Sequence, residues 1–465
     1  MSFQEPTVKI VDKFELYGLN YDSIKTQTGG KVLGEGGYGC VVSPPLKCNK
    51  PFFKIPYSVD EKYVSKIFEY DEDDEDVFNE LKLGNKLITI DPYQKYFSPI
   101  INGCNFIKQK HPDIQYLASK PDYDESSSTN SDKKDNKCSI FNNIEYLNLI
   151  SKNAGVDFDV ALRNKNPLVI NFIKENYIAI FKHFCTATYL LHKNSILHRD
   201  IKTLNAMINY KPDREKANVT LIDFGLSVQM NKKFTFYDLY ELTYFGTDYY
   251  KPLEIVIINA MLKVLKKNKY QEPSDFKKLV LKRVFDNYKY IARDIEQDFY
   301  FTQNGFTYNG DILNKDRNSK EPRYANKNLI NHLYNQLYKD YNNQKLLKYL
   351  TTNEKNSFIY KWDVFSLGLM FAEIIIKAKI KDNQAFKLVN NMVNPLYFKR
   401  YTIKDCLEDP LFKEKNQEKT SPTIESISKT KISKTKISKK ITSNSKSSKK
   451  TKKNKNQLLK LLEIK

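Results

Sequence analysis

The sequence predicts an α+β fold of two lobes, in which a small β-rich N-terminal lobe precedes a larger helical C-terminal lobe that carries an insertion. Two patterns lead to this fold class. Runs of β-branched residues and glycine turns, typical of strands, come early in the chain, whereas apolar residues at helical spacing come later. The chain has 465 residues, of which 40% are hydrophobic, so it is long enough to form two lobes around a sizeable core.

Residues 32–42 have the pattern of a strand, a glycine-rich turn and a second strand. Glycines let the backbone approach phosphate groups and point amides at them, because no Cβ intervenes. Strand and loop residues follow, so a hairpin over nucleotide phosphates fits better than a dinucleotide site, with an ordinary glycine hairpin as the alternative. The candidate nucleotide-binding residues of this hairpin are Leu33, Gly34, Glu35, Gly36, Gly37, Tyr38, Gly39, Cys40 and Val41.

The next predicted strand, residues 63–68, carries one lysine, Lys66, in an otherwise apolar and aromatic run. A cation on such a strand needs an anion, and the α and β phosphates of a nucleotide would supply it. Lys54 is the competing candidate, but the prolines on both sides of it favour a loop. In the helix predicted to follow, Glu80 is placed to pair with the strand lysine, and Glu75 is the alternative.

The two lobes are expected to join at residues 151–157, after a strand predicted at residues 140–150. Backbone groups of residues 152–154 are candidates for binding an adenine edge, and Asp157 is a candidate for binding a ribose hydroxyl. A plain strand-to-helix turn is the alternative at this position.

A polar loop containing Asp200, Lys202 and Asn205 follows a predicted buried helix. An aspartate there orients a hydroxyl nucleophile and accepts its proton, while the asparagine holds magnesium against nucleotide phosphates. The lysine is placed to neutralise charge on the transferred phosphoryl group. Asp223 comes at the end of a predicted buried strand and is a second candidate magnesium ligand.

Taken in order, these motifs resemble those of the eukaryotic-type protein kinases. The residues that carry the resemblance are the glycine hairpin, His198-Arg199-Asp200 with Asn205, Asp223-Phe224-Gly225, the Gly246-Thr247 loop and the helix of Asp363. The family resemblance implies a bilobal protein-kinase-like fold, ATP and Mg²⁺ as cofactors, and transfer of the γ-phosphoryl group to a protein substrate. Lys202 with Thr247 resembles the serine/threonine branch of the family.

The resemblance also assigns roles. It implies that Asp200 is the catalytic base, that Asn205 and Asp223 hold magnesium, and that Lys66 with Glu80 positions the ATP phosphates. A nucleotide-binding pseudokinase that acts as a scaffold is the alternative function.

The resemblance implies two structural roles as well. Asp363 would brace the catalytic loop from behind, and Glu254 would pair with Arg400. Arg199 beside Asp200 suggests control by phosphorylation, with Thr235 and Thr243 as the candidate sites, although either threonine is equally well an ordinary surface residue.

Several features depart from the family pattern. The Ala-Pro-Glu motif is Pro252-Leu253-Glu254 here, and Asp363 comes 109 positions after Glu254, far more than is typical. The predicted domains are an N-terminal extension (1–27), a kinase domain (28–412) with lobes at 28–152 and 153–412 and an insertion at 255–355, and a disordered Lys-, Ser- and Thr-rich tail (413–465). The composition and the hairpin sequence are similar to those of protein kinases from giant DNA viruses (mimivirus-like).

The net charge is +21, of which the tail contributes +13. A flexible, solvating tail is expected, with an acidic partner or sequence-independent nucleic-acid binding as alternatives. Six scattered cysteines without a paired CxxC indicate a reducing compartment. The sequence therefore favours an intracellular protein without a membrane span, in the host cytoplasm if viral, with the virion or nucleus as alternatives. It does not predict the oligomeric state.

Overall fold

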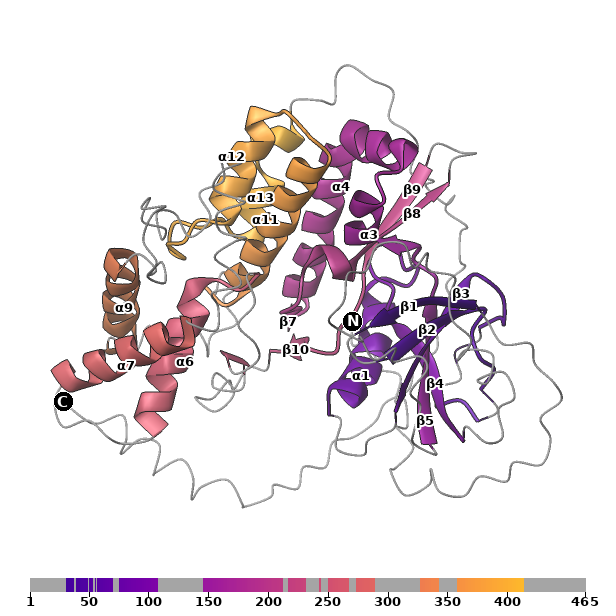
Figure 1. Ribbon diagram of the computed structural model, residues 1–465, viewed down its shortest axis with the longest axis horizontal. Helices are drawn as coiled ribbons and strands as arrows, with labels where there is room; N and C mark the ends of the chain where they lie inside the picture. The colour runs from indigo at the N-terminus through magenta and orange to yellow at the C-terminus, as the bar shows by residue number, and fades with distance from the viewer. Residues whose placement is uncertain are drawn as a thin grey trace, which may run out of the picture. The chain divides into compact units, whose positions relative to one another are not determined.

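The computed structural model describes the chain with gaps (Figure 1). The described residues are 31–36, 39–48, 50–52, 55, 57–69, 75–107, 145–211, 216–230, 242–243, 250–266, 273–288, 327–342 and 358–413. Several predicted features lie outside the described residues, namely the N-terminal extension, Gly37, Tyr38, Lys54, Thr235, the Gly246-Thr247 loop and the tail beyond Lys413.

The N-terminal lobe contains a five-stranded antiparallel sheet with the strand order β1-β2-β3-β5-β4. Its strands are β1 (Lys31–Gly36), β2 (Gly39–Ser43), β3 (Tyr63–Glu69), β4 (Ile100–Ile107) and β5 (Glu145–Lys152). Helix α1 (Glu75–Ile90) packs on one face, where Leu81 joins Phe68, Leu147 and Leu149 in a buried cluster. Because side chains alternate along a strand, Lys66 shares this face with Phe68.

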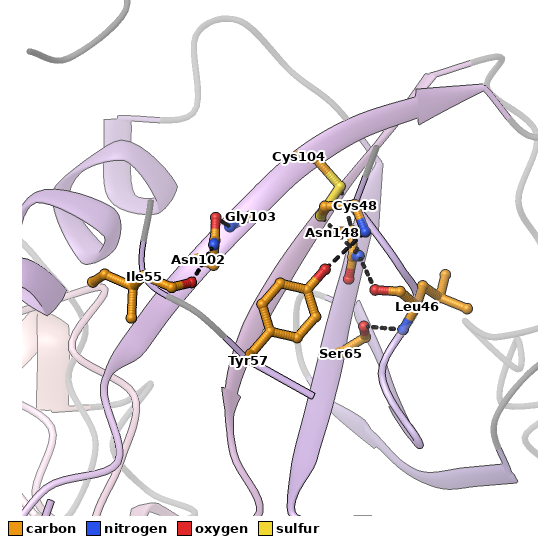
Figure 2. The surroundings of a disulfide bond; sticks show 9 residues. All are labelled: Leu46, Cys48, Ile55, Tyr57, Ser65, Asn102, Gly103, Cys104 and Asn148. Carbon is orange, nitrogen blue, oxygen red and sulfur yellow. Dashed lines mark hydrogen bonds between the residues drawn. A yellow bond between two sulfur atoms is a disulfide. The ribbon is translucent and has the colours of Figure 1, made fainter. Parts of the chain in front are cut away.

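The part of the β2–β3 connection around Leu46 and Cys48 lies on the other face of the sheet (Figure 2). The amide of Leu46 donates a hydrogen bond to Ser65 Oγ at 2.7 Å, and Asn148 Nδ2 donates to the Leu46 carbonyl at 3.2 Å. Ser65 and Asn148 are both fully buried, so this polar connection satisfies groups that would otherwise be buried without partners. Both faces of the sheet are therefore covered.

A disulfide between Cys48 and Cys104 ties this connection to β4, with the Cα atoms 5.6 Å apart (Figure 2). Cys40 is also disulfide-bonded. These disulfides differ from what a reducing compartment would favour, whereas Cys185 and Cys406 are free. Cys48 and Cys104 are 56 positions apart, and Asn148 of β5, whose Nδ2 lies near both sulfur atoms, is their shared neighbour. The spacing of the cysteines in the sequence carries no sign of that contact.

The C-terminal lobe is built around two long helices, α4 (Pro167–Lys193) and α11 (Tyr360–Lys377). The rings of Phe181 and Phe371 stack between them, with centroids 3.9 Å apart. Helices α12 (Asn383–Met392) and α13 (Ile403–Leu407) and the 3₁₀ turn η7 (Pro410–Phe412) complete this core. Smaller elements frame the site: β6 (Val156–Asp157), α3 (Phe158–Arg163), β7 (Ile196–Leu197), η4 (Thr203–Asn205), β8 (Ala206–Lys211), β9 (Lys216–Leu221) and β10 (Val228–Gln229).

Within the region predicted as an insertion, the described residues form three helices, α6 (Leu253–Lys266), α7 (Pro273–Tyr288) and α9 (Lys327–Asn342). They share a second apolar core, to which Trp362 of α11 contributes. In the part of the chain that the structure describes, none of the helices combines the length and apolar character that crossing a membrane requires.

Replacing Cys48 and Cys104 together by alanine should lower the free energy of unfolding by about 4 kcal/mol, because the disulfide restricts the unfolded chain over a loop of this length. Urea unfolding under oxidising conditions measures the change. The free buried cysteines Cys185 and Cys406 are kept in both the wild type and the double variant. An unchanged unfolding midpoint would show that the disulfide does not hold the connection onto the sheet.

Candidate active site

Residues 198–205 form the loop that the family resemblance implies is catalytic, called the catalytic loop below. The carboxylate of Asp363, which is fully buried on α11, holds it from behind. Its Oδ2 accepts a hydrogen bond from the amide of His198 at 2.8 Å, and its Oδ1 accepts one from the amide of Arg199 at 2.9 Å. His192 Nε2 lies 3.0 Å from Oδ2. Burial raises the pKa of Asp363, but the hydrogen bonds and charge of the two histidines outweigh it, so the pKa is lowered. The bracing contact predicted for this aspartate is therefore confirmed.

Three predicted polar residues of the loop contact one another. Asp200 Oδ2 lies 2.8 Å from Lys202 Nζ and also accepts a hydrogen bond from Asn205 Nδ2 at 2.8 Å. The Asn205 amide donates a second bond to the Asp200 backbone carbonyl at 2.8 Å. The aspartate carboxylate is thus oriented by an amide and a cation from its own loop, an arrangement suited to holding a general base in one conformation.

The strand lysine lies between two carboxylates. Lys66 Nζ is 3.7 Å from Glu80 Oε2 and 3.6 Å from Asp223 Oδ1. Burial lowers the pKa of Lys66, but the charges of Glu80 and Asp223 outweigh it and raise the pKa, so the side chain is a cation at neutral pH. Burial raises the pKa of Glu80. The structure therefore brings Lys66 to Glu80, its predicted partner, and also to Asp223, which was predicted as a magnesium ligand.

The segment from Asp223 to Ser227 is fixed by contacts with both lobes. Phe224 is buried, and its ring lies edge-on to Phe97 with centroids 5.9 Å apart. Asn79 Nδ2 of α1 donates to the carbonyl of Ser227 at 2.7 Å and to that of Gly225 at 3.2 Å. The sequence analysis did not identify Asn79. Its position next to Glu80 on α1 was the one feature that could have indicated a place near the site.

Asn205 and Asp223 lie at neighbouring strand ends. Strands β8 and β9 pair Ala206 with Leu221, and the amide of Ile222 donates to the Asn205 carbonyl at 3.0 Å. Asp223 and Arg199 both have positive φ angles, 62° and 70°, a backbone conformation that is strained for non-glycine residues and often occurs at functional sites.

The donor set at these two positions fits Mg²⁺. An amide oxygen and a carboxylate oxygen are ligands that magnesium accepts, and the ion usually shares its coordination sphere with phosphate and water. Among the described residues, no three His, Cys, Asp or Glu side chains gather into a complete metal site. Magnesium here would therefore be held jointly by Asn205, Asp223 and the phosphates.

The predicted hairpin residues divide between two surfaces. Val41 pairs with Lys66 across β2 and β3, so its side chain lies on the Lys66 face. Cys40 is fully buried and disulfide-bonded on the opposite face, so its side chain points away from Lys66, and its place in nucleotide binding stays a prediction. Leu33 on β1 is 49% exposed. The backbones of Gly34, Glu35, Gly36 and Gly39 belong to β1 and β2.

The junction between the lobes uses several of its predicted ligand-binding groups internally. The backbone N–H of Asn153 donates a hydrogen bond to the Lys62 carbonyl at 2.7 Å, and the Lys152 carbonyl accepts one from Ser98 Oγ at 2.8 Å. Asp157 caps α3, since its Oδ1 accepts a hydrogen bond from the Val160 amide at 2.7 Å. The role of Asp157 in binding ribose stays a prediction. The cap uses Oδ1, so Oδ2 is the oxygen that would accept a hydrogen bond from a ribose hydroxyl.

The predicted phosphorylation site Thr243 is buried, with 4% of its surface exposed. Its carbonyl and hydroxyl both accept hydrogen bonds from Asn259 Nδ2. Arg199 donates to the backbone carbonyls of Leu226 and Leu242 at 3.2 and 2.9 Å. In this conformation Thr243 is not accessible to a modifying enzyme, which counts against it as the regulatory residue.

The ion pair predicted between Glu254 and Arg400 is confirmed. It is bidentate, with Arg400 Nη1 donating to Oε1 at 2.6 Å and Nη2 donating to Oε2 at 3.2 Å. Both side chains are fully buried. The guanidinium also lies over the ring of Phe365, 4.7 Å from its centroid, which is a cation–π contact.

The comparisons with known proteins agree with this site. Residues 140–277 match the protein kinase domain family. The chain is 33% identical over 143 residues to serine/threonine-protein kinase Nek9 of Mus musculus, which covers 29% of this chain and 12% of that protein. It is 34% identical over 86 residues to serine/threonine-protein kinase KIC1 of Saccharomyces cerevisiae and 33% identical over 85 residues to serine/threonine-protein kinase mig-15 of Caenorhabditis elegans, each covering 18% of this chain and 7% of the relative.

Residues 140–277 are thus similar to protein kinase domains, and the three relatives are serine/threonine-protein kinases. The aligned segments span about an eighth or less of the length of these relatives, so the similarity concerns this domain and not the rest of those proteins.

Replacing Asp363 by asparagine should lower the free energy of unfolding by about 2 kcal/mol, because buried backbone amides lose a charged acceptor. Urea unfolding measures this change. The control is Glu408→Gln, since that side chain is exposed at the C-terminal end of α13 and forms a surface ion pair with Lys404. Equal stability of the two variants would contradict the bracing role.

Proposed function

We propose that this protein is an ATP-dependent serine/threonine protein kinase that transfers the γ-phosphoryl group of ATP to hydroxyl groups of protein substrates. The observation that supports this most strongly is the arrangement of Asp200. Its carboxylate is oriented by Asn205 and Lys202, and its loop is fixed on Asp363. Lys66 supplies a cation beside Asp223.

The residues have distinct tasks in this proposal. ATP, bound with Mg²⁺, supplies the phosphoryl group. Asp200 orients the acceptor hydroxyl and accepts its proton, and Lys202 offsets negative charge next to it. Asn205 and Asp223 would hold the metal, and Lys66 would bind phosphate oxygens while Glu80 keeps it in place. Catalysis then rests on positioning and charge neutralisation by groups that are already in place.

The intracellular location and the similarity to kinases of giant DNA viruses stay predictions. The disulfide between Cys48 and Cys104 counts against a reducing environment for the mature protein. A protein substrate follows from the class of enzyme, whereas the partner of the basic tail is a separate prediction.

Replacing Asp200 or Asp223 by alanine should reduce phosphoryl transfer about a thousandfold or more, because each change removes a group required at the reacting centre. Transfer from γ-labelled ATP to casein, with Mg²⁺ present, measures the rate. Mass spectrometry of the products identifies whether serine or threonine carries the phosphate.

The matched control is Asp275→Ala, which removes an exposed carboxylate from the first turn of α7. It should transfer phosphate like the wild type. Near-normal transfer by either active-site variant would refute the assigned roles. A wild-type protein that binds ATP but transfers no phosphate would instead support the pseudokinase scaffold.

A further inference from the structure

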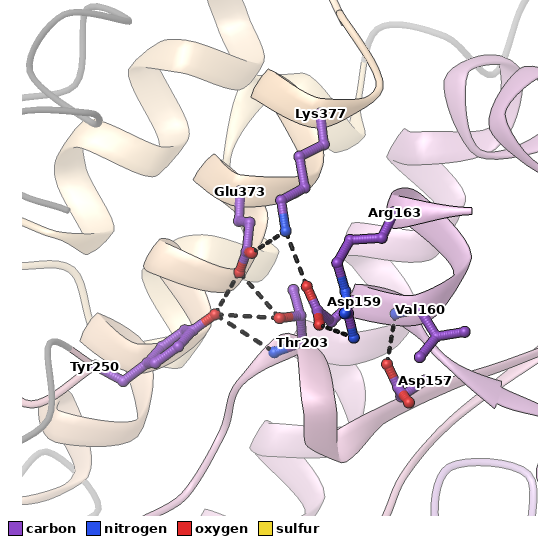
Figure 3. Close-up of polar contacts among 8 residues, drawn as sticks. All are labelled: Asp157, Asp159, Val160, Arg163, Thr203, Tyr250, Glu373 and Lys377. Carbon is purple, nitrogen blue, oxygen red and sulfur yellow. Dashed lines mark hydrogen bonds and ion pairs between the residues drawn. The ribbon is translucent and has the colours of Figure 1, made fainter. Parts of the chain in front are cut away.

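A buried polar network joins the catalytic loop to α11 (Figure 3). Its centre is the carboxylate of Glu373, which is 7% exposed. Oε2 of Glu373 accepts hydrogen bonds from Thr203 Oγ1 at 2.9 Å and from the Tyr250 hydroxyl at 2.5 Å. Thr203 lies between Lys202 and Asn205 in the catalytic loop. Tyr250 comes from a different segment, so one carboxylate oxygen links two parts of the site.

Tyr250 is also held by its backbone. Its carbonyl accepts a hydrogen bond from Ser366 Oγ of α11 at 2.8 Å, and its hydroxyl lies 3.4 Å from Thr203 Oγ1. Both ends of this residue are thus attached to α11, directly or through Glu373. A movement of the Glu373 carboxylate would change the hydrogen bonds that hold Thr203 and Tyr250 to α11.

Lys377, one turn further along α11, neutralises this carboxylate. Its Nζ lies 2.5 Å from Glu373 Oε1 and 2.9 Å from Asp159 Oδ1. Asp159 also pairs with Arg163 of α3 at 2.7 Å. Burial lowers the pKa of Lys377, but hydrogen bonds and charge from Glu373 and Asp159 outweigh it and raise the pKa. The lysine is therefore a cation at neutral pH.

The charge of Lys377 matters because Glu373 is buried. A buried carboxylate carries an unfavourable desolvation free energy, which the attraction to a nearby cation offsets. If the cation is removed, the carboxylate takes up a proton or moves towards water. Either change alters the two hydrogen bonds that Glu373 accepts from Thr203 and Tyr250. The effect of a substitution at Lys377 should therefore reach the catalytic loop through Glu373.

We propose that Lys377 is a positioning residue for the loop that carries Asp200 and for Tyr250, which it controls by holding Glu373 as the shared anchor of Thr203 and Tyr250. This inference rests on the proposed kinase function. Lys377 acts through Glu373, so it is not itself a catalytic residue. Its contact with Asp159 also links this anchor to α3, the helix that Asp157 caps.

Three variants of the full chain test the proposal: Lys377→Met, Lys377→Arg, and Lys377→Met combined with Glu373→Gln. The single methionine variant should lower kcat/KM for casein about tenfold, because hydrogen bonds to a buried charged group are disturbed. The KM for ATP should stay within about twofold of the wild type, since the phosphate-binding residues are untouched. The arginine variant should regain most of the activity.

The double variant should be less impaired than Lys377→Met alone, since the amide needs no cationic partner but still accepts hydrogen bonds. Lys381→Met is the control, because that lysine is exposed just beyond the same helix. The proposal would be overturned if Lys377→Met impaired the kinetic constants for casein and for ATP equally, or if the arginine and double variants recovered no activity. Lys377 would then be a purely structural residue.

Amide hydrogen exchange separates this proposal from the proposed function. Exchange over residues 198–206 and 250–254 should be faster in Lys377→Met than in the wild type and unchanged in Lys377→Arg. Unchanged exchange in the methionine variant would overturn the positioning role whether or not the protein transfers phosphate. If exchange is faster in Lys377→Met but the wild-type protein transfers no phosphate, the proposed kinase function is refuted and the positioning role is not.

Discussion

The geometry of the site depends on one buried contact, the carboxylate of Asp363 with the amides of His198 and Arg199. It holds Arg199 at a positive φ of 70°, a strained conformation that needs such support, and so sets where Asp200 lies. Asp363 is fixed in turn because α11 packs against α4 through stacked Phe181 and Phe371 rings. The hydrophobic core thereby determines the position of a catalytic loop made of polar residues.

A second constraint links the sheet to this loop. Lys66 lies between Glu80 of α1 and Asp223, and Asn79 binds the segment that follows Asp223. Opposite charges in a partly buried setting attract more strongly than at the surface, but only if their geometry is maintained. Covering both faces of the sheet, by α1 and by the disulfide-tied connection, limits the movement of β3 and therefore of Lys66.

Much of this was predictable because it is local. Lys66, Glu80, Asp200 and Asn205 occur in short motifs at fixed spacing, and helix boundaries such as the end of α4 at Lys193 follow apolar periodicity. What the sequence did not reveal depends on contacts between ordinary residue types far apart in the chain: the cysteine pair of the N-terminal lobe and the anchor that Glu373 and Lys377 form under the catalytic loop. A buried threonine likewise looks like a surface one until its neighbours are known, as Thr243 shows.

A crystal structure with a non-hydrolysable ATP analogue and Mn²⁺ tests the central claim most directly, because anomalous scattering locates the metal independently of the protein atoms. The account predicts a manganese peak bound by Asn205 and Asp223, with Lys66 Nζ at hydrogen-bonding distance from a phosphate oxygen and Asp200 free to meet an acceptor hydroxyl. A metal bound elsewhere, or a nucleotide that leaves Lys66 still paired only with Glu80 and Asp223, would contradict it.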